Sequence, residues 1–240
     1  MKKLLLGLLL VSSVLSFGAQ RVPIEKLVGN GDGQLLYLEG ENKPYSGEVE
    51  RKYPNGKLLG VATMKNGKLE GKAYEYFESG KVMREETYVN GAANGPAKSY
   101  YENGQVEYET NFKNSQREGI EKAYSKSGVL VSEVPFKNGN ATGLVKLYNE
   151  QTGKLEYETN IVNGVRNGLS KKFYPNGKLL SEVVFKNDKE EGIMKAYYEN
   201  GKLQGEAPYK NGKIDGVVKM YDEAGKVIEQ ATFKNGQQVK

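Results

Sequence analysis

Short stretches of alternating apolar and polar residues fill the chain from about residue 41 onward. In residues 178–185, for example, Leu179, Ser181, Val183 and Phe185 alternate with Leu180, Glu182 and Val184. This period of two is typical of β-strands. No later stretch keeps apolar residues at i, i+3, i+4 and i+7, so few helices are expected.

The same strand pattern recurs in register along the chain. The second residue after each turn glycine is apolar: Leu58, Val82, Val106, Leu130, Leu155, Leu179, Leu203 and Val227. The eighth residue is apolar as well: Met64, Tyr88, Phe112, Phe136, Ile161, Phe185, Tyr209 and Phe233. We expect these two positions to form one interior stripe that is buried when successive copies stack.

The turn glycines themselves reveal a repeat. They lie at 56, 80, 104, 128, 153, 177, 201 and 225, at intervals of 24 residues with one interval of 25. A second series, 47, 71, 95, 119, 143, 168, 192 and 216, keeps the same spacing and the same single insertion, which falls in residues 149–153. A turn that absorbs one residue without disturbing the later period indicates a one-dimensional array of similar units.

Each unit reads as two strands and two turns. One turn carries an Asn-Gly pair, as at Asn66-Gly67 and Asn211-Gly212, which suits the positive φ of a two-residue hairpin turn. The other follows a Tyr-Pro-Asn-Gly or Tyr-Glu-Asn-Gly pattern, as at 53–56 and 101–104. Residues 41–240 are therefore predicted to form tandem β-hairpins.

The first residues have the features of a secretory signal peptide. Lys2 and Lys3 precede an apolar run from Leu4 to Leu15, and small residues follow, which predicts cleavage after Gly18 or Ala19. The run is shorter than the roughly 20 residues that cross a bilayer, so we expect an exported chain without a transmembrane span, in the periplasm, on the outer surface or secreted. The predicted division is a signal peptide at 1–19, an N-terminal cap or degenerate repeat at 20–40, and the repeats at 41–240.

The amino-acid composition excludes several kinds of functional site. The chain has no Cys, His or Trp, which excludes disulfides, thiolate nucleophiles and the commonest metal ligand. Its formal charge of +5 is too weak to indicate nucleic acid binding. Acidic residues recur in every copy, whereas an active site needs a unique constellation. We therefore expect no enzyme activity, no cofactor and no metal site.

The units resemble the MORN repeat in its variant form, found in bacterial exported proteins and in proteins labelled as antitoxin components. The resemblance rests on units such as Tyr209-Lys210-Asn211-Gly212-Lys213 through Gly216 to Tyr221. It implies an all-β fold, an elongated, twisted, single-layer antiparallel sheet of tandem hairpins. The copies depart from the commoner pattern in lacking Trp and in having Glu-centred strands such as 203–206. MORN repeats also accompany the catalytic domain of plant-type phosphatidylinositol phosphate kinases, and no kinase motif is present here.

Two charged series are the candidates for a functional surface. The first, a basic and aromatic stripe, consists of Lys98, Lys122, Lys146, Lys171, Lys195 and Lys219 with Tyr100, Tyr124, Tyr148, Phe173, Tyr197 and Tyr221. The second consists of Glu85, Glu109, Glu133, Glu158, Glu182 and Glu206. If neighbouring strands place Glu beside Lys, the two series neutralise each other. If a one-residue slip separates them, the stripe is free to bind an anionic partner.

Three functions follow from these features. The first is an exported, non-enzymatic repeat scaffold that mediates protein–protein interaction at the cell envelope or cell surface. The second is a binder of anionic membrane lipid or glycan through the basic stripe. The third is an antitoxin-like or immunity-like neutraliser of a partner toxin.

Overall fold

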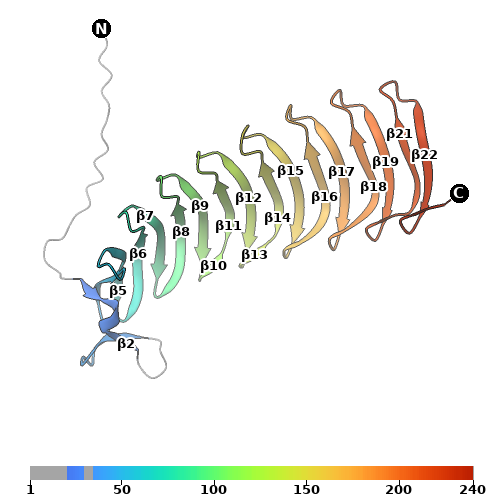
Figure 1. The fold of residues 1–240 in the computed structure, drawn as a ribbon. Helices are drawn as coiled ribbons and strands as arrows, with labels where there is room; N and C mark the ends of the chain where they lie inside the picture. The colour runs from blue at the N-terminus through green and yellow to red at the C-terminus, as the bar shows by residue number, and fades with distance from the viewer. Residues whose placement is uncertain (1–20, 30–34, 240) are drawn as a thin grey trace, which may run out of the picture.

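A computed structural model describes residues 21–29 and 35–239. The predicted signal peptide, 1–19, lies outside the described residues. The described chain forms one long, open, mostly antiparallel sheet of successive hairpins, whose strands are bent along their length (Figure 1). This confirms the expected fold class. Within the described ranges the helical content is one short 3-10 helix, η1 (Ile24–Lys26).

Twenty-one strands belong to this sheet, and a separate two-stranded sheet, β2 (Leu27–Gly29) with β3 (Leu36–Leu38), lies at its N-terminal end. The strands up to the inserted residue are β1 (Val22–Pro23), β4 (Gly47–Lys52), β5 (Leu58–Lys65), β6 (Lys68–Tyr76), β7 (Val82–Val89), β8 (Ala92–Tyr100), β9 (Val106–Lys113), β10 (Gln116–Arg117), β11 (Gly119–Tyr124), β12 (Leu130–Lys137), β13 (Asn140–Ala141) and β14 (Gly143–Tyr148). The strands after it are β15 (Leu155–Val162), β16 (Val165–Phe173), β17 (Leu179–Lys186), β18 (Lys189–Tyr197), β19 (Leu203–Lys210), β20 (Lys213–Ile214), β21 (Gly216–Tyr221), β22 (Val227–Lys234) and β23 (Gln237–Val239).

The Asn-Gly pairs make the tight hairpin turns. Asn66 has φ 50° and Gly67 has φ 77°, and Asn211 and Gly212 have φ 52° and 78°. Two successive positive φ values match the twist of the flanking strands. The weaker pairs Asn114-Ser115 and Asn187-Asp188 adopt the same conformation, so the turn geometry is uniform although its residues are not.

The other turns bind each repeat to the next. The Tyr53 hydroxyl donates to the Tyr76 carbonyl at 2.8 Å, and the Tyr174 hydroxyl donates to the Tyr197 carbonyl at 2.7 Å. In each case donor and acceptor lie 23 residues apart, in neighbouring units. The turn tyrosines therefore stabilise stacking between repeats.

A regular register shift changes the expected interior stripe. Lys172 of β16 pairs with Ser181 of β17, but the next residue, Phe173, pairs with Leu179. Leu180 is thus an extra residue, a β-bulge that breaks the alternation. Directly opposed residues share a face, so Leu179 and its equivalents join the face of Phe173, while Phe185 and its equivalents lie on the other face. The expectation of one stripe made from both positions was therefore wrong.

The sheet has two different faces. We call the face of the Lys and Glu series the ladder face and the opposite one the pocket face. The buried apolar residues of the described chain all lie on the pocket face: Val49, Met64, Ala93, Ala97, Ala123, Val145 and Phe185. The pocket face therefore holds what core this single layer has.

The described part of the segment expected to act as a cap, 20–40, contacts the N-terminal edge of the array. Strand β1 pairs in parallel with β4, Val22 opposite Val49. The Leu36 amide donates to the Gly67 carbonyl at 3.0 Å, so the segment also contacts the first Asn-Gly turn. We predict that this segment stabilises the array, and a substitution at Gly67 can test this.

Replacement of Gly67 by alanine is expected to destabilise the protein at least twice as much as the same change at Gly164. Both glycines have positive φ, 77° and 81°, so each substitution costs about 1 kcal/mol of backbone strain. At Gly67 a Cβ would also lie 2.9 Å from the Leu36 amide nitrogen, whereas at Gly164 nothing lies within 4 Å. Denaturant unfolding of both variants measures the difference. Equal losses would show that contact with 35–45 adds nothing to stability.

Candidate functional site

The ladder face carries an alternating row of carboxylates and ammonium groups. Glu85 lies opposite Lys98, which lies opposite Glu109, and the alternation continues through every strand pair to Glu206 and Lys219. Because each inner Lys has Glu on both neighbouring strands, the register is the one in which the two series neutralise each other.

Several of these pairs are close ion pairs. The Lys98 ammonium lies 2.7 Å from the Glu109 carboxylate, and the Lys171 ammonium lies 3.2 Å from Glu158. The hydrogen bond from Lys98, together with one from Tyr124, holds the pKa of Glu109 below its ordinary value. Both partners in these pairs are partly exposed, so each pair stabilises the fold only modestly.

The tyrosines of the stripe are bound to the same carboxylates. The hydroxyls of Tyr100, Tyr124, Tyr148, Tyr197 and Tyr221 donate to Glu85, Glu109, Glu133, Glu182 and Glu206 over 2.7–3.0 Å. Burial and the hydrogen bond to Glu85 raise the pKa of Tyr100 to about 12. Burial and the equivalent carboxylate have the same effect on Tyr148 and Tyr197.

The structure thus brings together all the residues of the predicted stripe. It also gives most of them glutamate partners within the sheet, and these carboxylates occupy the positions between the lysines that an anionic ligand would use. Partner binding by this stripe stays a prediction.

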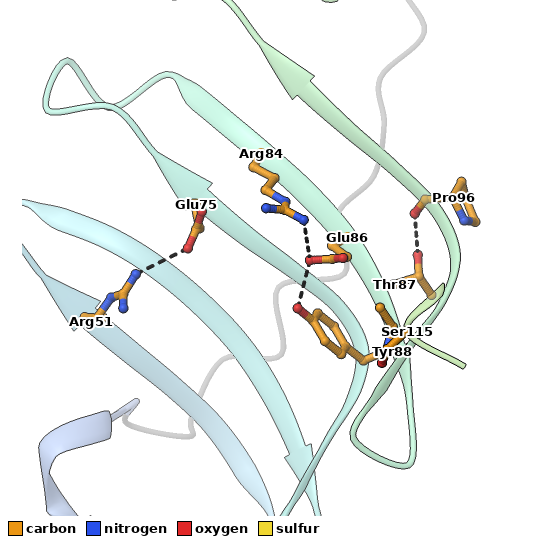
Figure 2. A network of polar contacts seen from close by, with 9 residues as sticks. Arg51, Glu75, Arg84, Glu86, Thr87, Tyr88, Pro96 and Ser115 are labelled. Carbon is orange, nitrogen blue, oxygen red and sulfur yellow. Dashed lines mark hydrogen bonds and ion pairs between the residues drawn. The ribbon is translucent and has the colours of Figure 1, made fainter. Parts of the chain in front are cut away.

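The pocket face has a different polar chemistry, based on arginine. At its N-terminal end Arg51 contacts Glu75 at 3.2 Å, and Glu86 contacts Arg84 at 3.1 Å and accepts from the Tyr88 hydroxyl at 2.8 Å (Figure 2). Further along, Arg117 and Arg166 lie over the rings of Phe136 and Phe185, 5.0 and 3.9 Å from the ring centres.

The pocket face also differs from one repeat to the next. The position of Lys172 is occupied in the successive copies by Arg51, Glu75, Ser99, Ala123, Leu147, Lys172, Ala196 and Met220. The position of Tyr157 is occupied by Gly60, Arg84, Tyr108, Ser132, Tyr157, Ser181, Gly205 and Glu229. The ladder positions, in contrast, are Lys or Glu in six successive copies. The residues that recur build the framework of the sheet. The residues that vary give each repeat a different set of side chains on the pocket face.

A hollow of about 660 Å³ lies on the pocket face in the C-terminal half. Its lining comes from strands β14 to β19 and combines apolar side chains with hydroxyl and charged groups: Leu147, Glu156, Tyr157, Arg166, Ser170, Lys171, Lys172, Ser181, Val183, Phe185, Glu190, Met194 and Tyr209. Its size is within the usual range for small-ligand sites.

Tyr157 has an unusual environment in this hollow. Burial alone would raise its pKa, but hydrogen bonds with Ser170, Thr159 and Arg166 outweigh burial, so the pKa lies below its ordinary value. The hydroxyls of Thr159 and Ser170 are themselves hydrogen-bonded to each other. Negative charge is therefore stabilised at the Tyr157 hydroxyl, in contrast to the ladder tyrosines.

Neither a cluster of metal ligands nor a long apolar helix occurs in the described ranges. Among residues 21–29 and 35–239 no group of three or more acidic side chains could hold a metal ion. Over the same residues the structure has no helix with the length and apolar character to cross a membrane.

Successive hairpins, recurring turns and a continuous ladder define this chain as a tandem β-hairpin repeat protein. It belongs to the MORN repeat variant family, whose pattern matches residues 45–66, 69–90, 93–114, 117–138, 166–187, 190–211 and 214–235. The copy with the inserted residue, between 138 and 166, is not matched, yet β14 and β15 form the same hairpin there. MORN repeats generally form non-catalytic scaffolds that interact with proteins or membranes.

Other comparisons add little. No curated protein matches the sequence. Among solved structures, TarM is 14% identical over 50% of this chain, which spans 20% of TarM, with a TM-score of 0.23. A porin-like protein from Bacteroides uniformis is 10% identical over 84% of this chain and 90% of its own, with a TM-score of 0.20. The Photorhabdus luminescens Tc holotoxin pore is 12% identical over 84% of this chain and 14% of its own, with a TM-score of 0.20.

Proposed function

We propose that this chain is an exported, non-enzymatic repeat scaffold that binds a protein partner through its pocket face. The observation that carries the proposal is the variation of the pocket face between copies that otherwise repeat. A surface that repeats every two strands, roughly every 9.6 Å, offers a rigid partner several equivalent positions, because a shift by one repeat restores the same contacts. A face that changes from copy to copy offers one best position, and specificity is a difference between such positions.

The ladder face is less suited to this task. Four of its lysines, Lys98, Lys146, Lys171 and Lys219, are already paired with neighbouring glutamates, and its five tyrosines donate to glutamates as well. A ligand there would have to displace these contacts at each repeat, with little net gain. The large hollow, in contrast, lies on the pocket face.

Two adjacent residues allow a direct test. Ile193 lies on the ladder face, 53% exposed, and Met194 lines the hollow on the pocket face. A photoreactive amino acid placed at 194 in the full chain, in cells, is expected to crosslink a discrete protein partner, whereas the same group at 193 is not. Mass spectrometry identifies the adduct, and the N-terminus of the recovered chain is expected to follow Gly18 or Ala19.

The stripe is tested in the same cells. With Lys98, Lys122, Lys146, Lys195 and Lys219 replaced by Gln, and Lys171 kept because it also lines the hollow, adducts from 194 are expected to persist, and binding to anionic vesicles is expected to be unchanged. Adducts from 193 alone, or loss of all binding in the glutamine variant, would assign recognition to the stripe instead.

A further inference from the structure

We propose that the hollow on the pocket face binds an acidic segment of the partner polypeptide, one in which a single carboxylate lies beside a large apolar side chain. This rests on the proposed function and names the chemistry that the site recognises. Three features of the hollow support this proposal: its apolar floor, its donor-rich end, and its unpaired cation.

The apolar part of the hollow comes mainly from strands β17 to β19. Val183, Phe185, Met194 and Tyr209 line it, and Phe185 is only 5% exposed. Methionine and aromatic side chains adapt to apolar groups of different shape. The volume of about 660 Å³ accommodates an aromatic or large aliphatic side chain together with flanking main chain.

The donor-rich end comes from β15 and β16. The Arg166 guanidinium lies 3.9 Å from the centre of the Phe185 ring, and its Nε donates to Asp188 at 2.9 Å. A guanidinium has five N–H donors, so others remain available on a side chain that is 38% exposed. The Tyr157 side chain lies beside it, and the donors around its hydroxyl, Arg166 among them, lower its pKa, so this end of the hollow favours negative charge.

Lys172 supplies a cation with no ion pair inside the described ranges. It lies directly opposite Tyr157 and is exposed. Its equivalents in the first two copies, Arg51 and Glu75, are paired with each other. An exposed ammonium beside a donor-rich hollow attracts a carboxylate before and during docking.

The acidic groups of the hollow limit what it accepts. Glu156 and Glu190 also line it, and they repel additional negative charge. A run of acids or a polyanion is therefore disfavoured. A ligand with one carboxylate next to an apolar side chain complements both the cationic end of the hollow and its apolar floor.

Methionine methyl NMR can test this on the full chain. The described residues contain Met64, Met83, Met194 and Met220, and of these Met194 lines the hollow. The probes are acetyl-Gly-Phe-Glu-Gly-amide and two analogues, one with the isosteric Gln and one with the cationic Lys in place of Glu. We expect the Glu peptide to shift the Met194 signal, the Gln peptide to bind about tenfold more weakly, and the Lys peptide to bind more weakly still.

Two variants localise the effect. Lys172→Gln removes an exposed charge that makes no bond in the described chain, so it leaves the fold intact and is expected to weaken the Glu peptide at least about threefold. Lys122→Gln, on the ladder face, is the matched control and is expected to leave affinity unchanged. Tyr157→Phe removes the hydroxyl and is expected to reduce the preference for Glu over Gln.

Equal binding of the three peptides, equal shifts at Met64 and Met194, or unchanged affinity in Lys172→Gln would each overturn the inference. The outcome is separable from that of the proposed function. A protein adduct at 194 without a preference for the Glu peptide keeps the scaffold and rejects the acidic segment. A preference for the Glu peptide without a protein adduct at 194 keeps the acidic-ligand specificity of the hollow and rejects the pocket face as the site of a protein partner.

Discussion

Replacement of Phe185 by alanine is expected to split the unfolding of the array into two transitions. Phe185 is 5% exposed and lies under the Arg166 guanidinium. Truncation of a buried Phe costs about 3–5 kcal/mol, and we expect the lower end because the neighbouring hollow admits water. In a linear array each unit contacts only its neighbours, so the loss falls on the contacts between β16, β17 and β18.

Hydrogen exchange can locate that loss. In the Phe185→Ala variant, amides of β16 to β19 are expected to lose protection first, while β5 to β9 remain protected. The matched control is Phe233→Ala, the same repeat position in β22, where the side chain is only half-buried. It is expected to cost about 1 kcal/mol by its smaller burial, with a single transition. Simultaneous loss of protection from β5 to β19 would contradict nearest-neighbour coupling.

The repeating part of this fold could be predicted from sequence because it depends on local signals. Asn-Gly pairs and the period of two define hairpins without any long-range information. The single extra residue at 149–153 could likewise be placed in a turn, and the structure extends that turn to span Asn149 to Lys154.

The two faces could be predicted only in part. The alternation from Ser181 to Phe185 was correct, but the bulge at Leu180 moved Leu179 to the other face. Nothing in the residues marks that bulge, because it follows from how the turn closes on the neighbouring strand. The pairing of Glu with Lys depended on the same register, and therefore stayed open until the strands were placed.

The pocket-face residues were missed for a different reason. The residues that recur in every copy build the framework of the sheet. Tyr157, Arg166 and Lys172, in contrast, depart from the repeat pattern, so a search for recurring residues does not find them. The available signal was the departure itself: Tyr, Arg and Lys at positions that hold small or apolar residues in several other copies. Only the sheet brings these three residues, from β15 and β16, to one hollow.

The ladder tyrosines predict a loss of stability at alkaline pH. The pKa is raised from 10.0 to about 12 in Tyr100, Tyr148 and Tyr197, by burial and by the hydrogen-bonded glutamate. The folded protein therefore retains these protons at a pH where the unfolded chain has released them. Their contribution is fully present below pH 10.0 and is lost as the pH rises toward about 12.

The size of this effect can be bounded and measured. A fully shielded tyrosine with this change in pKa would contribute about 2.7 kcal/mol, and because these side chains are only half-buried we discount the value to about 1 kcal/mol each. Denaturant unfolding across this pH range should show the decline, with tyrosinate absorbance as the monitor. The matched variant changes Tyr100, Tyr148 and Tyr197 to Phe, the residue that already occupies the equivalent position at Phe173. This variant is expected to remove about 3 kcal/mol of the decline in the free energy of unfolding. If its stability declines as steeply as that of the unmodified chain, the hydroxyl–carboxylate pairs do not control alkaline stability.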